Sequence, residues 1–168
     1  LSELAPYPFY FQFTLTSYGT DIEVNVPHKK EVMIPVFQRL SETIGSKRVI
    51  WRYDPILFTK RYTPEYHLNA FRQMAEALRG YTEKCVISFV DIYTKNKKKM
   101  QELGVYELPK AELQTFAREL CKIARGNGMV MASCAEQIDF SHCGIVHNAC
   151  IDKVLIEEII GCKLKGAK

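Results

Sequence analysis

The stretch CVISFV, residues 85–90, is an almost unbroken apolar run that only Ser88 interrupts. A short apolar run of this kind is typical of a strand that is buried on both faces, as strands are in parallel sheets. Parallel neighbours are joined by helical crossovers, so strands and helices should alternate on either side of it.

Three further segments predict strands. Residues 7–16 alternate aromatic and apolar side chains with polar ones, which favours a strand with two unlike faces. Residues 49–53 are a second strand, which should end at Asp54 because Pro55 follows, and residues 129–132 are a fourth. The four strands begin near residues 9, 49, 85 and 129, at separations of 40, 36 and 44 residues, which is the spacing of successive βα units.

Helical stripes of apolar residues lie between these strands, at residues 32–44, 68–78 and 113–123, and residues 152–160 predict a last short helix. Thr63 is a candidate N-cap for the second helix, with Pro64 as its first residue. Pro35 either begins the first helix or kinks it.

The predicted fold class is therefore α/β, with successive βα units and parallel strands. An open doubly wound sheet and an arc of a (β/α) barrel both fit. No G-x-G-x-x-G and no P-loop follows any strand, so we favour a partial TIM-like barrel. Four units cannot close a barrel. We expect residues 1–168 to be a single α/β domain, a fragment of a longer barrel protein, with exposed strand edges that promote self-association.

Composition is that of an ordinary globular protein: 168 residues, 47% hydrophobic and 25% charged, with a net charge of +4. No apolar run is long enough to cross a membrane, and no targeting segment is visible, so we expect a cytoplasmic location and reduced cysteines. The lysines at 95 and 97–99 are typical of a solvated surface, and a nucleic-acid-binding patch is the weaker alternative.

Polar residues should gather where parallel strands end, which is the functional edge of both architectures. One interpretation is a small-molecule pocket in which Arg52 holds an anion and carboxylates act as acids, bases or anchors. The other is an Arg52–Asp54 ion pair that only stabilises the strand ends. Ser88 alone is typical of a small residue packed between strand and helix. The candidate binding residues are Gln12, Thr14, Arg52, Asp54, Asp91 and Glu136.

Cysteines and histidines are dense between Cys134 and Cys150, but they do not match a zinc pattern, because no C-x-x-C pair occurs. We expect Cys134 and Cys150 to bind a metal only together with ligands from outside this chain. Catalytic residues cannot be assigned, since no nucleophile motif is present.

Several strings together resemble one family: YFQFTLT at residues 10–16, WRYDP at 51–55, CVISFVDIY at 85–93, CAE at 134–136 and CID at 150–152. In this order they resemble domain-of-unknown-function family 1848, an uncharacterised prokaryotic family. The resemblance implies similarity to radical S-adenosylmethionine enzymes, and hence an iron–sulfur cluster and S-adenosylmethionine in the full-length protein.

The resemblance also implies that this chain is the central part of such a protein, lacks both ends and is inactive alone. The cluster-binding cysteines then match no position here. What carries over is the barrel wall, namely Gln12, Thr14, Arg52, Asp54, Asp91, Cys134, Glu136 and Cys150. Two other functions stay open: a metal-dependent barrel lyase or hydrolase that uses Asp54, Asp91 and Glu136, and a nucleic-acid-binding module.

Overall fold

The computed structural model describes residues 2–4, 7–91, 93, 96–134 and 138–164. Its five strands form one sheet in the order β1-β2-β3-β4-β5, and every neighbouring pair is parallel. The strands are β1 (Phe11–Thr14), β2 (Val49–Ile56), β3 (Lys84–Phe89), β4 (Val130–Cys134) and β5 (Val146–Asn148).

The helices that connect the strands are α1 (Ile34–Ile44), α2 (Pro64–Ala77), α3 (Lys97–Glu102) and α4 (Lys110–Gly126), and α5 (Lys153–Ile160) follows β5. A π-helical turn, η2 (Lys29–Met33), leads into α1, and three short 3-10 segments are η1 (Ser2–Leu4), η3 (Ser46–Arg48) and η4 (Ser141–Cys143). No helix among the described residues is both long and apolar enough to span a bilayer.

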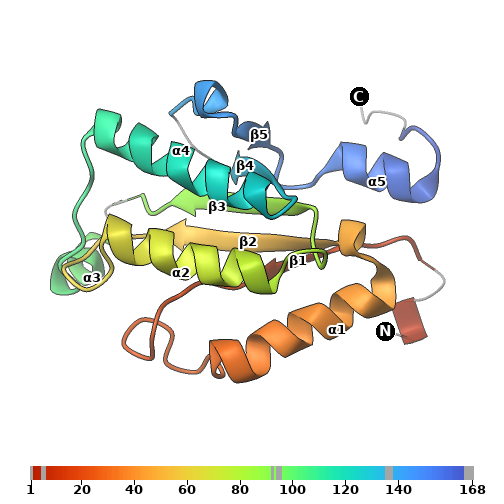
Figure 1. Ribbon diagram of the computed structural model, residues 1–168, viewed down its shortest axis with the longest axis horizontal. Coiled ribbons are helices and arrows are strands. Elements are labelled where there is room, and N and C mark those ends of the chain that lie inside the picture. Colours follow the sequence, from red (N-terminus) through yellow and green to blue (C-terminus); the bar gives the residue numbers. More distant parts are fainter. Residues whose placement is uncertain (1, 5–6, 92, 94–95, 135–137, 165–168) are drawn as a thin grey trace.

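The long helices α1, α2 and α4 form one layer against a single face of the sheet, as Figure 1 shows. The strands also follow one another in space in their order along the chain. A doubly wound sheet reverses its order at a switch point and carries helices on both faces. The predicted α/β class with parallel βα units is confirmed, and the sequential strand order is compatible with an arc of a barrel.

The strand count predicted from the sequence was wrong, because the sheet has five strands. Strand β5 has only three residues, and both Val146 and His147 are exposed, so it lacks the apolar signal of a buried strand. The first strand is shorter than residues 7–16 and keeps only Phe11–Thr14. The short helix α3 was also not predicted, since its lysine-rich sequence has no apolar stripe.

Strand β2 runs past the predicted end and reaches Ile56 through Pro55. The Asp54–Pro55 peptide is cis, and the register with β3 shifts between Tyr53 and Ile56. The helix starts follow the sequence more closely. Thr63 caps α2 by accepting a hydrogen bond from the backbone N–H of Tyr66, and α1 begins beside Pro35 rather than being kinked there.

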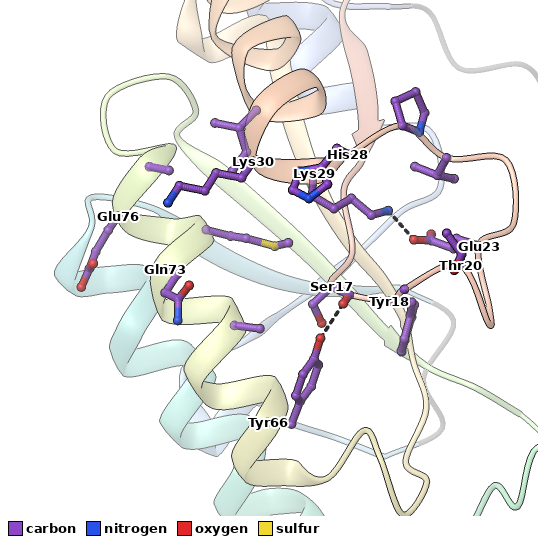
Figure 2. Close-up of a pocket in the computed structure, with 17 residues that line it drawn as sticks. Ser17, Tyr18, Thr20, Glu23, His28, Lys29, Lys30, Tyr66, Gln73 and Glu76 are labelled. Atoms are coloured by element: carbon purple, nitrogen blue, oxygen red, sulfur yellow. Dashed lines mark hydrogen bonds and ion pairs between the residues drawn. The ribbon is translucent and has the colours of Figure 1, made fainter.

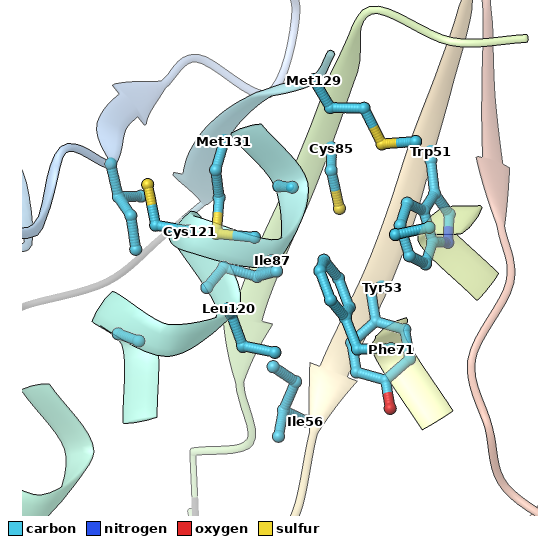
Figure 3. Packing of buried hydrophobic residues seen from close by; sticks show 14 of the residues in the cluster. Trp51, Tyr53, Ile56, Phe71, Cys85, Ile87, Leu120, Cys121, Met129 and Met131 are labelled. Atoms are coloured by element: carbon cyan, nitrogen blue, oxygen red, sulfur yellow. The ribbon is translucent and has the colours of Figure 1, made fainter. Parts of the chain in front are cut away.

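The main core lies between the sheet and the helical layer, and its centre is drawn in Figure 3. Trp51 of β2 stacks on Phe71 of α2, with ring centroids 4.7 Å apart, and both side chains are fully buried. The indole N–H of Trp51 donates to the backbone carbonyl of Leu15 at 2.8 Å, so the polar atom of this core residue is also bonded.

The other face of the sheet has a small apolar cluster of its own. Val86 of β3 and Ala132 of β4 are register partners, Ile50 of β2 belongs to the same cluster, and Leu155 of α5 packs against it. Lys84, at the start of β3, bonds Asp152 at the start of α5 at 2.6 Å. Helix α5 therefore covers this face near the beginnings of the strands, where Figure 1 places it.

We predict that Phe71→Ala lowers the free energy of unfolding by about 3–5 kcal/mol, because it removes a fully buried ring and leaves a cavity against Trp51. Urea denaturation measures this. Arg72→Ala, at an exposed position one residue further along α2, is the control and should change stability by less than about 0.5 kcal/mol. Equal effects of the two substitutions would contradict the packing described here.

Candidate functional site

The alternation of β2 places Arg52 and Asp54 on the face opposite the helical layer, next to Gln12 of β1. The Arg52 Nε donates to Asp54 Oδ2 at 2.6 Å, and a second guanidinium nitrogen pairs with the same oxygen. The remaining guanidinium nitrogen donates to Gln12 Oε1 at 2.6 Å. The guanidinium is therefore held by two neighbouring strands in one orientation.

Asp54 is anchored on both carboxylate oxygens, because the hydroxyl of Ser88 on β3 donates to its Oδ1. Ser88 was expected to be only a small packing residue, and that interpretation is wrong: the side chain lies on the polar face and joins β3 to the network. Its two-residue spacing from Val86, which lies on the same face, is the sequence signal that identifies it.

Burial and pairing with Asp54 shift the pKa of Arg52 in opposite directions. Burial lowers the pKa of its guanidinium, but the hydrogen bond and the charge of Asp54 outweigh this and leave the pKa above its ordinary value. Arg52 is thus a permanent cation. Only 21% of its side chain and 13% of that of Asp54 is exposed, so water screens the pair weakly.

The other predicted binding residues are not all brought to this network. Thr14 is exposed and lies opposite Arg52 in the β1–β2 register, on the face that carries Gln12. Asp91 is exposed and lines a separate cavity of about 230 Å³ at the ends of β2 and β3, with Phe58 and Tyr106. No contact among the described residues links Asp91 to Arg52 or Asp54. Glu136 lies outside the described residues.

Two cysteines adjoin the network. Cys134 is the last residue of β4, and its Sγ lies 3.6 Å from the Sγ of Cys150, which follows β5. Gln12 Nε2 donates to the backbone carbonyl of Cys150 at 3.0 Å, so the residue that holds Arg52 also holds this loop. Burial raises the pKa of the Cys134 thiol, Cys150 raises it further, and the Arg52 guanidinium partly offsets both. We call Gln12, Arg52, Asp54, Ser88, Cys134 and Cys150 the inner-face cluster.

The described residues do not fit an iron–sulfur cluster, which is normally held by four cysteine thiolates. The inner-face cluster supplies two thiols. Among the described residues, no group of three or more His, Cys, Asp or Glu side chains is arranged to hold a metal ion. His142 and His147 are exposed and do not complete a set with Cys134 and Cys150.

A second polar network supports β2 from the helical side. The phenol of Tyr53 bonds Nδ1 of His67 on α2 at 2.7 Å, and it also bonds the hydroxyl of Ser17 at 2.7 Å. His67 Nε2 bonds the backbone carbonyl of Leu57 at 3.0 Å, so Nε2 carries the proton and Nδ1 accepts one from Tyr53. No spacing in the sequence pairs these residues, because the contacts are made by the packing of α2 on β2.

A cavity of about 540 Å³ lies on the helical side, between the loop after β1 and α2 (Figure 2). Tyr66 closes one side by donating to the backbone carbonyl of Ser17 at 2.7 Å. Lys29 is paired with Glu23, and Glu23 also accepts a hydrogen bond from Thr16. Lys29 is thus charge-paired, whereas Lys30 lines the same cavity and is exposed.

Stability should depend on pH through His67. Burial lowers the pKa of His67 from 6.5 to about 4, so the unfolded chain binds a proton between these pH values that the folded chain does not. The stabilisation is complete above pH 6.5 and is lost as the pH falls towards 4, by about 3 kcal/mol at most. His67→Gln keeps a donor and an acceptor without titrating. Urea denaturation from pH 4 to 7 should show a shallower pH dependence for this variant, and an identical dependence would contradict the assignment.

The ion pair at the centre of the cluster can be measured with a double-mutant cycle. Arg52→Ala should cost about 1–3 kcal/mol, because it leaves the Asp54 carboxylate mostly buried without its cation. Asp54→Ala should be less harmful in the Arg52→Ala background than alone, by at least about 0.5 kcal/mol. Unfolding free energies that simply add would show that the two side chains are not coupled.

The family of the chain follows from a comparison with known families. The model of one family, described as a domain of unknown function (DUF1848), matches residues 1–168. Neither the curated proteins nor the solved structures contain a match. The chain belongs to the DUF1848 family, whose function is uncharacterised.

Proposed function

We propose that this chain forms the ligand-binding wall of a (β/α)-barrel enzyme, in which Arg52 binds a carboxylate-bearing small molecule. The observation that carries the proposal is the fixed guanidinium on the helix-free part of the sheet. Asp54 and Gln12 occupy three of its five N–H groups and Cys134 engages a further one, so one N–H has no acceptor among the described residues. A guanidinium held in place by neighbours binds a carboxylate with little loss of side-chain entropy.

The position of the cluster agrees with this role. In the strand register Arg52 lies level with Val86 of the apolar patch beneath α5, whereas Asp54 and Ser88 lie two residues further towards the strand ends. In barrels of parallel βα units the ligand binds at the carboxyl ends of the strands. The hydrogen bonds of Asp54 to Arg52 and Ser88 argue for an anchoring role rather than for a free catalytic base.

In its finer form, the proposal is a radical S-adenosylmethionine-like enzyme, as the resemblance to the family implies. S-adenosylmethionine carries a carboxylate that suits Arg52. The ligands of an iron–sulfur cluster would come from outside the described residues, because the inner-face cluster supplies only two thiols. When bound, such a cluster supplies the electron that starts radical chemistry. This chain would bind and orient the small molecule beside it.

The described geometry favours neither alternative function. A metal-dependent lyase or hydrolase needs its carboxylates together, but Asp54 and Asp91 lie in separate sites. Lys97, Lys98 and Lys99 are exposed on α3, so a nucleic-acid patch stays a prediction without a shaped groove to support it. The open edges at β1 and β5 are where we expect self-association if it occurs.

We predict that the complete protein binds S-adenosylmethionine and that Arg52→Gln weakens binding about 10- to 100-fold, since one charge-assisted contact is worth about 1.5–3 kcal/mol. Isothermal titration calorimetry measures this on anaerobically purified protein. Arg72→Gln, on the exposed side of α2, is the matched control and should bind like the wild type. Decarboxylated S-adenosylmethionine should bind wild type and Arg52→Gln equally.

Iron and acid-labile sulfide in the same preparation, with 5′-deoxyadenosine formed after reduction, test the finer form. A cluster and cleavage would support the radical enzyme. Ligand binding that depends on Arg52, in a protein without a cluster, would support the carboxylate site and contradict the radical chemistry. Unchanged binding by Arg52→Gln would refute the role of Arg52 itself.

A further inference from the structure

Cys134 and Cys150 differ from the other described cysteines because their sulfur atoms face each other. The Sγ–Sγ distance is 3.6 Å, which is about 1.6 Å longer than a disulfide bond. Cys121 and Cys143 instead direct their thiols at backbone carbonyls, of Gly144 and Gln114 respectively. The Cys134 and Cys150 thiols are thus close enough to bond after a small movement.

The two thiols of the pair have different access to solvent. Cys134 is 4% exposed at the end of β4, whereas Cys150 is exposed in the loop between β5 and α5. A reagent in solution therefore meets Cys150 first, and Cys134 lies directly behind it. This is the arrangement of an attacking thiol with a second thiol that resolves the product.

Hydrogen bonds hold the loop that carries Cys150 in place on both sides of this residue. Gln12 donates to the carbonyl of Cys150 at 3.0 Å, and the backbone N–H of Asp152 donates to the phenol of Tyr10 at 3.1 Å. Lys84 holds both Asn148 and Asp152, at 2.5 and 2.6 Å. Gln12 of β1, Lys84 of β3 and Tyr10 just before β1 therefore fix the position of the loop that carries Cys150.

We propose that Cys134 and Cys150 form a dithiol that is oxidised reversibly to a disulfide by exchange with a small-molecule disulfide. The proposal does not rest on the function proposed above, because it uses only the geometry and access of the two thiols. It assigns a redox modification site to the face of the sheet that carries Arg52.

The exchange proceeds in two steps. The Cys150 thiolate attacks one sulfur of the small disulfide RSSR, a Cys150–S–S–R bond forms, and one RS⁻ leaves with the electron pair of the broken S–S bond. Cys134 then loses its proton to solvent and attacks the Cys150 sulfur, which releases the second RS⁻. The protein loses two electrons and two protons, and RSSR becomes two RSH.

Arg52 lies beside the thiol that acts in the second step. Burial raises the pKa of Cys134, Cys150 raises it further, and the Arg52 guanidinium partly offsets both.

The test uses the complete protein with Cys162→Ser, which removes the other exposed cysteine of the described chain. The protein is equilibrated with oxidised and reduced glutathione, quenched with acid and alkylated, and its peptides are mapped by mass spectrometry. We expect a Cys134–Cys150 crosslink that dithiothreitol reverses. Adding Cys134→Ser should abolish the crosslink and leave a stable glutathione adduct on Cys150.

Cys121→Ser is the matched control, because it removes a buried thiol outside the pair and should leave the crosslink intact. A persistent glutathione adduct on Cys150 with Cys134 present would overturn the proposal, since it would show that Cys134 does not resolve it. Failure of both thiols to react until a chelator removes bound metal would also overturn it, in favour of a metal site.

Discussion

Strand β2 contributes side chains both to the core and to the polar cluster, because successive side chains of a strand point to opposite faces of the sheet. Trp51 and Tyr53 enter the core beneath the helices, while Arg52 and Asp54 emerge on the other side. The strand that carries the polar cluster is thus held in place by fully buried core residues on its other face. A one-residue slip in register would bury the ion pair and expose the tryptophan, so the apolar core fixes where the charges lie.

The same strand links the chemistry of the two faces. On the helical face, the Tyr53 hydroxyl is hydrogen-bonded directly to His67 and Ser17. The low pKa of His67 keeps this network neutral near pH 7. On the other face, Arg52 stays charged because Asp54 pairs with it. Strand β2 therefore has a neutral hydrogen-bonded network on one face and a paired cation on the other, and no buried side-chain nitrogen or oxygen among the described residues lacks a partner.

The inner-face cluster brings two kinds of chemistry into one place. Gln12 contacts both the guanidinium of Arg52 and the backbone of Cys150, so the proposed anion site and the proposed dithiol share a residue. Cys134 interacts with Arg52 directly, which couples the charge of the one to the ionisation of the other.

Much of the fold could be predicted from the sequence. The apolar run at residues 85–90, the alternation around Trp51 and the cap at Thr63 are local signals, because burial on two faces, strand periodicity and capping each depend on near neighbours. The pairing of Arg52 with Asp54 also follows from period two along one strand. Strand β5 was missed because three residues with exposed side chains carry no such signal.

Only the tertiary structure decided which side chains from different units meet. Ser88 reaches Asp54, Gln12 reaches Cys150 across 138 positions, and His67 reaches Tyr53, through strand register and helix packing that no local pattern encodes. Asp91, two residues beyond the end of β3, lines a separate cavity for the same reason. The sequence by itself determined the βα units and the two faces of each strand, since these depend on residues close along the chain. The composition of the site was decided by contacts between distant residues, which form only when the sheet assembles.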